Sequence, residues 1–253
     1  MLSKRIIACL DVRNGSVVKG INFEGLRVAG DPSELSRRYN RDGIDEIVIL
    51  DVTATIEKRK ALADTIHAVA KEIFLPLCVG GGIKDEAHAD AAIEAGADKV
   101  SLNTAAIANP ELLTTLARRY GSQAVVVAID AKRVGDIFQI YVRSGQQATR
   151  RDAVDWAREA ADRGAGEILL TSIDRDGTKS GFDCELTAAV SNAVSIPVIA
   201  SGGAGTFDHF VDVFTKGQAH AALAASIFHY NEHAVSDLKN HLRQNGIPVR
   251  LSC

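Results

Sequence analysis

Eight short apolar runs alternate with helix-length segments along this chain of 253 residues. Such runs, rich in Val and Ile, are typical of strands buried on both faces of a parallel sheet. Eight alternations of strand and helix in about 250 residues predict an α/β fold of the (β/α)8 barrel type. The expected strands are residues 6–10, 46–51, 76–79, 99–103, 125–130, 167–172, 197–201 and 221–226. Asp31 and Asn109 each precede a proline, which predicts that both residues cap a helix.

The chain also contains an internal repeat. Five residues recur 121 positions later, and Asp11 recurs as Asp130 after 119 positions. The five are Gly43, Glu46, Pro76, Gly81 and Gly82, which return as Gly164, Glu167, Pro197, Gly202 and Gly203. We therefore expect one barrel domain over residues 1–253, built from similar half-barrels at approximately 1–121 and 122–253. Because half the strands make half a turn of a closed barrel, equivalent side chains should face each other across one mouth.

Composition excludes several classes of protein. The net charge is −3 and the basic residues are scattered, so the sequence shows no basic patch for binding nucleic acid or a membrane surface. No apolar run reaches the roughly 18 residues that span a bilayer, and the start of the sequence lacks the apolar core of a signal peptide. The four cysteines, Cys9, Cys78, Cys184 and Cys253, fit neither metal-ligand spacing nor a disulfide framework. We expect a cytoplasmic protein with reduced thiols.

Two of the apolar strands end in an aspartate, Asp11 in one and Asp130 in the other. Barrel enzymes place their active sites at the carboxyl ends of the strands. Two carboxylates facing each other there can serve as general acid and general base, provided that their surroundings separate their proton affinities. Either aspartate alone could instead cap a helix, but the matched pair favours catalysis.

Glycine-rich turns at residues 80–82 and 202–203 would allow backbone amides to approach an anion, and each half offers one such phosphate cradle. Glycines that merely make tight turns are the alternative. The long segment 12–30 is expected to form a lid loop with Lys19 as its working cation, although a solvated lysine is equally compatible. The polar loop 174–181 lacks the ligand set of a calcium site and favours hydroxyl recognition or closure over substrate. The candidate binding residues are Lys19, Gly81, Gly82, Asn103, Thr104, Thr171, Asp176, Gly177, Gly202, Gly203, Ala225 and Ser226, with no metal or cofactor expected.

Charged residues stand where several of the strands begin. Arg5 shares the parity of the inward-facing Asp11, and Glu46, Lys99 and Glu167 begin further strands. These four charges sum to zero, which is compatible with burial as a ring in the barrel floor. Solvated residues at the strand starts are the alternative that the pattern leaves open.

Long motifs occur along nearly the whole chain, among them KRIIACLDV, VGGGIKDEAHADAAIEAGADKVSLNTAA, GSQAVVVAIDAKRV, RGAGEILLTSIDRDGTKSGFD and IASGGAG. They give the chain a resemblance, nearly end to end, to the cyclase subunit of imidazole glycerol phosphate synthase, from histidine biosynthesis. The resemblance implies that Asp11 and Asp130 are catalytic. It also implies that ammonia from a glutaminase subunit, docked at the N-terminal face of the barrel, reacts with phosphoribulosyl-formimino-aminoimidazole carboxamide ribonucleotide, which carries a phosphate at each end. Arg5, Glu46, Lys99 and Glu167 would then gate the passage of ammonia.

Two other functions remain open at this point. The sister isomerase of the same pathway is also a half-barrel repeat with two aspartates and a bisphosphate ligand, but it has no use for an ammonia gate. A non-catalytic barrel that binds phosphate as a scaffold is the second, and the intact pair of aspartates argues against it.

Overall fold

The computed structural model describes residues 2–21, 24–52, 59–229 and 234–251, and the side chains at 19–21, 24–27, 59–61, 226 and 229 lie outside this description. The chain divides into two compact units. Unit 1 comprises residues 1–101 and 224–253, and unit 2 comprises residues 102–223.

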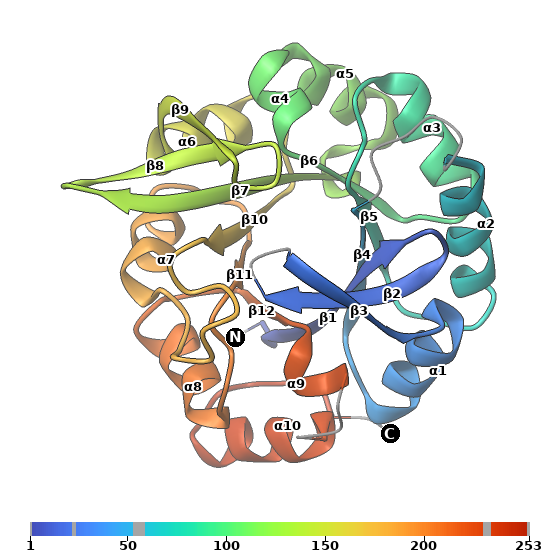
Figure 1. The fold of residues 1–253 in the computed structure, drawn as a ribbon. Helices are drawn as coiled ribbons and strands as arrows, with labels where there is room; N and C mark the ends of the chain where they lie inside the picture. Colours follow the sequence, from blue (N-terminus) through green and yellow to red (C-terminus); the bar gives the residue numbers. More distant parts are fainter. Residues whose placement is uncertain (1, 22–23, 53–58, 230–233, 252–253) are drawn as a thin grey trace. The chain divides into compact units, whose positions relative to one another are not determined.

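Unit 1 is built on the parallel strands β1 (Arg5–Arg13), β4 (Glu46–Asp51), β5 (Leu77–Gly80) and β6 (Lys99–Leu102). Its helices α1 (Pro32–Asp42), α2 (Arg59–Ala70) and α3 (Glu86–Glu94) lie along one face of these strands (Figure 1). The short α9 (Ser226–His229) and α10 (Val235–Gln244) complete it. All four residues of β5 are buried, as expected for a strand with apolar contacts on both faces.

Unit 2 contains the parallel strands β7 (Val125–Val134), β10 (Glu167–Ser172), β11 (Val198–Ser201) and β12 (Ala221–Ala224). The accompanying helices are α4 (Thr104–Ala108), α5 (Glu111–Tyr120), α6 (Ala153–Asp162), α7 (Cys184–Ser191) and α8 (Phe207–Thr215), with a 3-10 turn η2 (Ser122–Ala124) before β7. The first four residues of β10 and all of β12 are buried, with the apolar side chains of these strands in the core.

The predicted (β/α)8 barrel fold is confirmed. Within the described residues, eight parallel strands alternate with helices in the order β1, β4, β5, β6, β7, β10, β11 and β12. Each of them falls on an apolar run from which a strand was predicted. The single domain over residues 1–253 and its two similar halves stay predictions.

The expected lid loop over residues 12–30 is instead largely an antiparallel hairpin of β2 (Ser16–Ile21) and β3 (Glu24–Gly30). A second extension, β8 (Ile137–Val142) and β9 (Gln147–Asp152), occupies a segment for which no strand was predicted. Both extensions form because β1 continues past Asp11 to Arg13 and β7 continues past Asp130 to Val134. The continued strands offer backbone N–H and C=O groups with which the next segment pairs.

The two predicted helix caps have different outcomes. Asp31 caps α1, because its Oδ1 accepts hydrogen bonds from the N–H groups of Ser33 and Glu34 at 2.9 and 3.0 Å. The prediction for Asn109 is wrong. That residue ends α4 with its N–H bonded to the Ala105 carbonyl, and α5 begins after Pro110 without a side-chain cap.

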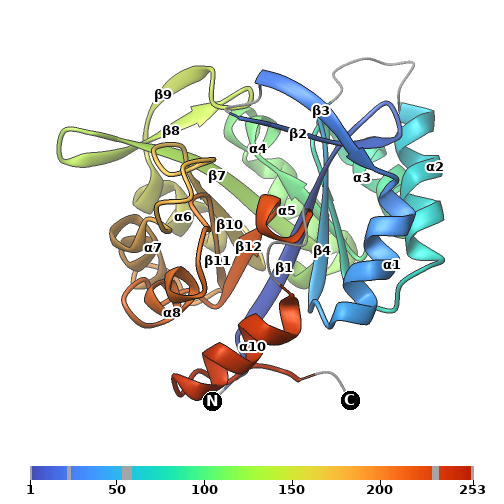
Figure 2. The same ribbon diagram turned by 60° about the horizontal axis from the view of Figure 1, so that its bottom comes forward.

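Helix α10 lies at the end of unit 1 where β1 and β4 begin (Figure 2). Lys239, only 3% exposed, donates from Nζ to the Gly43 carbonyl at 2.6 Å and pairs with Asp45 Oδ1 at 2.7 Å. The other oxygen of Asp45 accepts the N–H of Ile6 at 2.8 Å. This buried ion pair therefore joins α10 to the start of β1.

Candidate active site

Asp130 in unit 2 is held by a neighbouring side chain at the end of β6. Its Oδ2 accepts a hydrogen bond of 2.9 Å from Nδ2 of Asn103, which lies just before α4. In the sheet, Asp130 lies opposite Thr171 of β10, so Thr171 is its partner in the strand pair. The structure thus brings together three of the predicted site residues of this unit.

The surroundings of Asp130 favour its protonated form. Burial of the carboxyl is the largest cause that raises its pKa, to about 6, although the residue as a whole is only partly buried. The negative charge of Asp176 raises the pKa further, whereas the hydrogen bond from Asn103 opposes both effects. A carboxyl with such a pKa can gain and lose a proton near neutral pH, as general acid–base catalysis requires.

Asn103 and Thr104 were predicted to form part of a phosphate cradle, and their side chains bind within the protein. Asn103 donates to Asp130, and its Oδ1 is buried without a hydrogen-bond partner among the described residues. Thr104 Oγ1 accepts the N–H of Arg143, which lies after β8, at 3.1 Å. The β8–β9 extension is therefore tied to the start of α4.

The loop after β10 carries Asp176 and Gly177. The N–H groups of Arg175 and Asp176 both bond to the Ser172 carbonyl, which turns the chain sharply after the strand. Gly177 takes a left-handed φ of 73° in this turn. Asp174 accepts the N–H of Arg133 at 2.8 Å, so the loop is also bonded to the extended end of β7.

Gly202 and Gly203 follow β11 and pack tightly on the same loop. A Cβ at Gly202 would lie 2.8 Å from the Ser172 carbonyl oxygen, and one at Gly203 would lie 2.2 Å from that of Gly181. The Gly203 carbonyl also accepts a hydrogen bond of 2.8 Å from the Gly181 N–H. Both glycines have positive φ, so no larger residue fits this close approach of backbone to backbone.

Asp11 in unit 1 lies on β1 opposite Leu50 of β4 and is partly buried. The thiol of Cys9, two residues earlier on the same face of the strand, donates to Asp11 Oδ1 over 3.8 Å. Asp11 thus occupies the predicted position near the carboxyl end of its strand. That Asp11 and Asp130 face each other stays a prediction.

In the glycine turn of unit 1, Gly81 and Gly82 have different surroundings. A Cβ at Gly81 would lie 2.2 Å from the Asp51 carbonyl oxygen, so Gly81 is required for packing against the end of β4. Gly82 also has a positive φ, of 78°, but a Cβ there would meet nothing within 4 Å. Its open surroundings leave room for an anion to approach the backbone.

The second binding segment predicted in this unit is Ala225–Ser226, where α9 begins. The Phe228 N–H bonds to the Ala225 carbonyl at 3.1 Å, and Arg38 of α1 donates to the Phe228 carbonyl at 3.0 Å. The side chain of Ser226 lies outside the described residues, as does that of Lys19, whose backbone belongs to β2.

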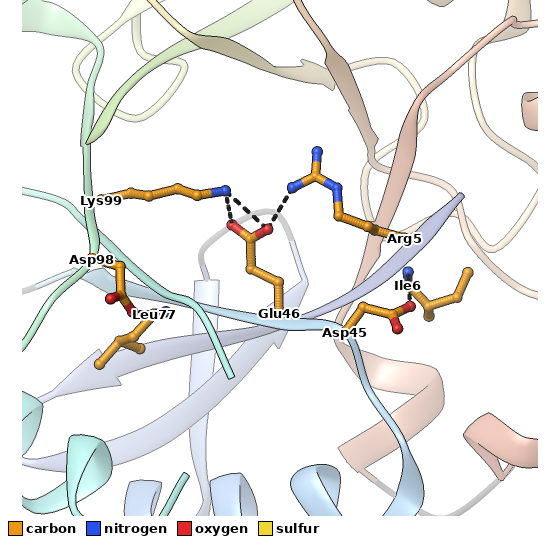
Figure 3. A network of polar contacts seen from close by, with 7 residues as sticks. All are labelled: Arg5, Ile6, Asp45, Glu46, Leu77, Asp98 and Lys99. Carbon is orange, nitrogen blue, oxygen red and sulfur yellow. Dashed lines mark hydrogen bonds and ion pairs between the residues drawn. The ribbon is translucent and has the colours of Figure 1, made fainter. Parts of the chain in front are cut away.

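Three of the four predicted floor charges form one cluster in unit 1 (Figure 3). Glu46, only 1% exposed, accepts from Arg5 Nη1 at 2.6 Å and from Lys99 Nζ at 2.9 and 3.1 Å. These residues stand at the starts of β1, β4 and β6, as their spacing predicted. The fourth, Glu167, begins β10 in unit 2 and is also buried.

Within the described residues, no group of three or more His, Cys, Asp and Glu could hold a metal ion. Cys9 and Cys78 are buried, and Cys184 is partly buried. A search of the described helices finds none that is long and apolar enough to cross a membrane.

Sequence reasoning missed two features of the site. Nothing in the sequence indicated that the side chain of Asn103 would bond to Asp130. His88 and His209 were also overlooked, although they are spaced by the same 121 residues as the glycine turns and accept hydrogen bonds from the backbone that follows those turns. The repeat was a signal that could have found them.

The chain is similar in sequence to known proteins along its whole length. Residues 5–234 match the family described as histidine biosynthesis protein. A protein of Acidobacterium capsulatum is 57% identical over 253 residues, which cover 100% of both chains. Proteins of Dehalococcoides mccartyi and Chlorobium phaeovibrioides are 54% and 55% identical over 251 residues, which cover 99% of this chain and 99% and 100% of theirs. Each of the three is named imidazole glycerol phosphate synthase subunit HisF.

Proposed function

This chain belongs to the family of the HisF cyclase subunits of imidazole glycerol phosphate synthase, an enzyme of histidine biosynthesis, and we propose that Asp11 and Asp130 carry out its acid–base chemistry. The observation that carries this assignment is the position of Asp130 beyond the middle of β7, where it accepts a hydrogen bond of 2.9 Å from Asn103 and where burial and the charge of Asp176 raise its pKa to about 6. One carboxyl would donate a proton while the other accepts one.

The proposed substrate is phosphoribulosyl-formimino-aminoimidazole carboxamide ribonucleotide. Its reaction with ammonia would yield imidazole glycerol phosphate and aminoimidazole carboxamide ribonucleotide. The two phosphates would bind at the turns that contain Gly82 and Gly203, with Lys19, Thr104 and the α9 start as further contacts. The open surroundings of Gly82 and its positive φ support the first of these assignments.

A glutaminase subunit is the proposed source of ammonia, and it would dock where the parallel strands begin. The support is the cluster of Arg5, Glu46 and Lys99, since a buried carboxylate that binds two partly buried cations is costly to form and has no evident use in a barrel that binds only at its other end. Glu167 would belong to the same gate. We place the protein in the cytoplasm, where cysteines such as Cys9 and Cys78 remain reduced.

The first test is turnover by the purified chain. With the bisphosphate substrate and an ammonium salt at mildly alkaline pH, both products should form without the glutaminase subunit. Asp11→Asn and Asp130→Asn should each lower turnover by about 100-fold or more, the usual contribution of a general acid or base. Asp136→Asn, an exposed position between β7 and β8, is the matched control. Near-normal rates in both active-site variants would contradict the assignment.

A further inference from the structure

His209 in α8 accepts two hydrogen bonds from the backbone that follows Gly202 and Gly203. Its Nδ1 lies 3.2 Å from the amide nitrogen of Gly205 and 3.2 Å from that of Thr206. Because a ring nitrogen that accepts from N–H groups cannot itself carry a proton, the neutral imidazole has its proton on Nε2. The two bonds tie the two residues that precede α8, and that follow the glycine-rich turn, to the first turn of the helix.

The same imidazole also packs against the loop after β10. A Cβ placed at Gly181 would lie 3.4 Å from His209 Cδ2, and one at Gly205 would lie 2.3 Å from the Lys179 carbonyl oxygen. Gly181 in turn donates its N–H to Gly203. His209 therefore contacts both polypeptide segments of this half of the site, including the loop that carries Asp176.

The arrangement recurs in unit 1. His88 Nδ1 lies 3.2 Å from the Lys84 amide nitrogen, and the pair Lys84 and His88 precedes Gly205 and His209 by 121 residues. Asp85 Oδ1 also lies 3.1 Å from this ring nitrogen. Because the bond recurs after both glycine turns, we infer that it belongs to the architecture of the turn. At His209 the ring nitrogen accepts from two backbone N–H groups.

We propose that His209 is a positioning residue for substrate binding, which holds the Gly202–Gly203 turn and the loop after β10 in the arrangement that receives a phosphate. The inference rests on the proposed function of that turn. The competing interpretation is a plain helix cap, since His209 is the third residue of α8 and its bond to Thr206 completes a capping box. A cap would stabilise the helix but would leave the affinity for substrate unchanged.

The experiment compares three variants in ammonium-dependent turnover. His209→Phe keeps the ring but removes the acceptor, so KM for the bisphosphate substrate should rise about tenfold while kcat changes little, because two hydrogen bonds that order the turn are lost. His209→Asn restores an acceptor near the position of Nδ1 and should return KM to within about twofold of the wild-type value. His220→Phe is the control, because His220 Nδ1 accepts the Val198 N–H at 3.2 Å at the opposite end of β11, and its KM should not change.

A wild-type KM in a folded His209→Phe variant would overturn the proposal, and so would equal impairment of the Phe and Asn variants. If His209→Phe does not fold, His209→Leu replaces it under the same two criteria. Failure of the wild-type protein to turn over would instead contradict the proposed function, so the two failures are distinguishable.

Discussion

Nδ2 of Asn103 donates to Oδ2 of Asp130 over 2.9 Å, and this bond joins the end of β6 to a carboxyl 27 residues further along the chain. It opposes the burial and the Asp176 charge that raise the pKa of Asp130 to about 6. Asn103 therefore lowers the proton affinity of the residue to which we assign acid–base chemistry.

Replacing Asn103 with Leu should raise the pKa of Asp130 further, because the lost bond favours the ionised carboxylate. The limb of the pH–rate profile that Asp130 controls should then move to higher pH. Turnover measured at a fixed concentration of free ammonia over a range of pH tests this. A shift of the alkaline limb would identify Asp130 as the acid, a shift of the acidic limb would identify it as the base, and an unmoved profile would contradict the expectation.

The same raised pKa predicts that Asp130 destabilises the fold above neutral pH. A carboxyl whose pKa is about 6 in the folded state and about 4 in the unfolded state binds more protons when folded between these values, so stability falls as pH rises through this range. Asp130→Asn should therefore raise the free energy of unfolding at pH 8 by on the order of 2 kcal/mol. The gain should shrink towards pH 4, and denaturant unfolding at both pH values measures it. A gain of equal size at both would indicate a cause other than ionisation.

Changing Lys99 to Ala should impair ammonia delivery more than cyclase chemistry. Lys99 bonds to Glu46 at the strand starts, and Asp11 lies four residues beyond Ile7, the partner of Glu46 in β1, which is roughly 13 Å at about 3.3 Å per residue. Activity with added ammonium should thus be largely retained, while activity with glutamine and the glutaminase subunit should fall.

The measurement for Lys99→Ala is the ratio of the two activities, with thermal stability determined alongside. Loss of one member of a buried ionic set can cost about 3 to 5 kcal/mol, and stability must be known before the ratio is interpreted. Arg37→Ala removes an exposed pair with Glu72 and serves as the control that should change neither quantity appreciably. Equal loss of both activities in a folded Lys99 variant would indicate that the cluster has only a structural role.

The two glycine turns should respond differently to Ala. Gly82→Ala meets no neighbouring atom, so we expect moderate strain from the positive φ, a folded protein and weaker substrate binding. Gly203→Ala would place Cβ 2.2 Å from the Gly181 carbonyl and should lower stability markedly. Thermal denaturation and KM of both variants test this difference. A stable Gly203→Ala protein with unchanged KM would contradict the expected clash with the Gly181 carbonyl.

The sequence alone determined the eight strands, because short apolar runs between turn residues are a local property of the chain. It also predicted that Asp11 and Asp130 lie towards the ends of their strands and that Arg5, Glu46 and Lys99 lie at the starts of theirs. The shared face of Arg5 and Asp11 followed from the alternation of side chains along a strand. The cap at Asp31 was equally legible, because the bonds that it makes reach only two and three residues ahead.

Only the tertiary structure decided the two antiparallel extensions and the polar contacts of the site. A strand such as β8 forms because the free edge of β7 is beside it, and that edge exists only after β7 continues past Asp130. The partner of Asn103 depends likewise on the register between segments that meet only in the folded chain. Such contacts follow no local period in the sequence, so the pattern of residues could locate the acid–base group but not the neighbours that set its pKa.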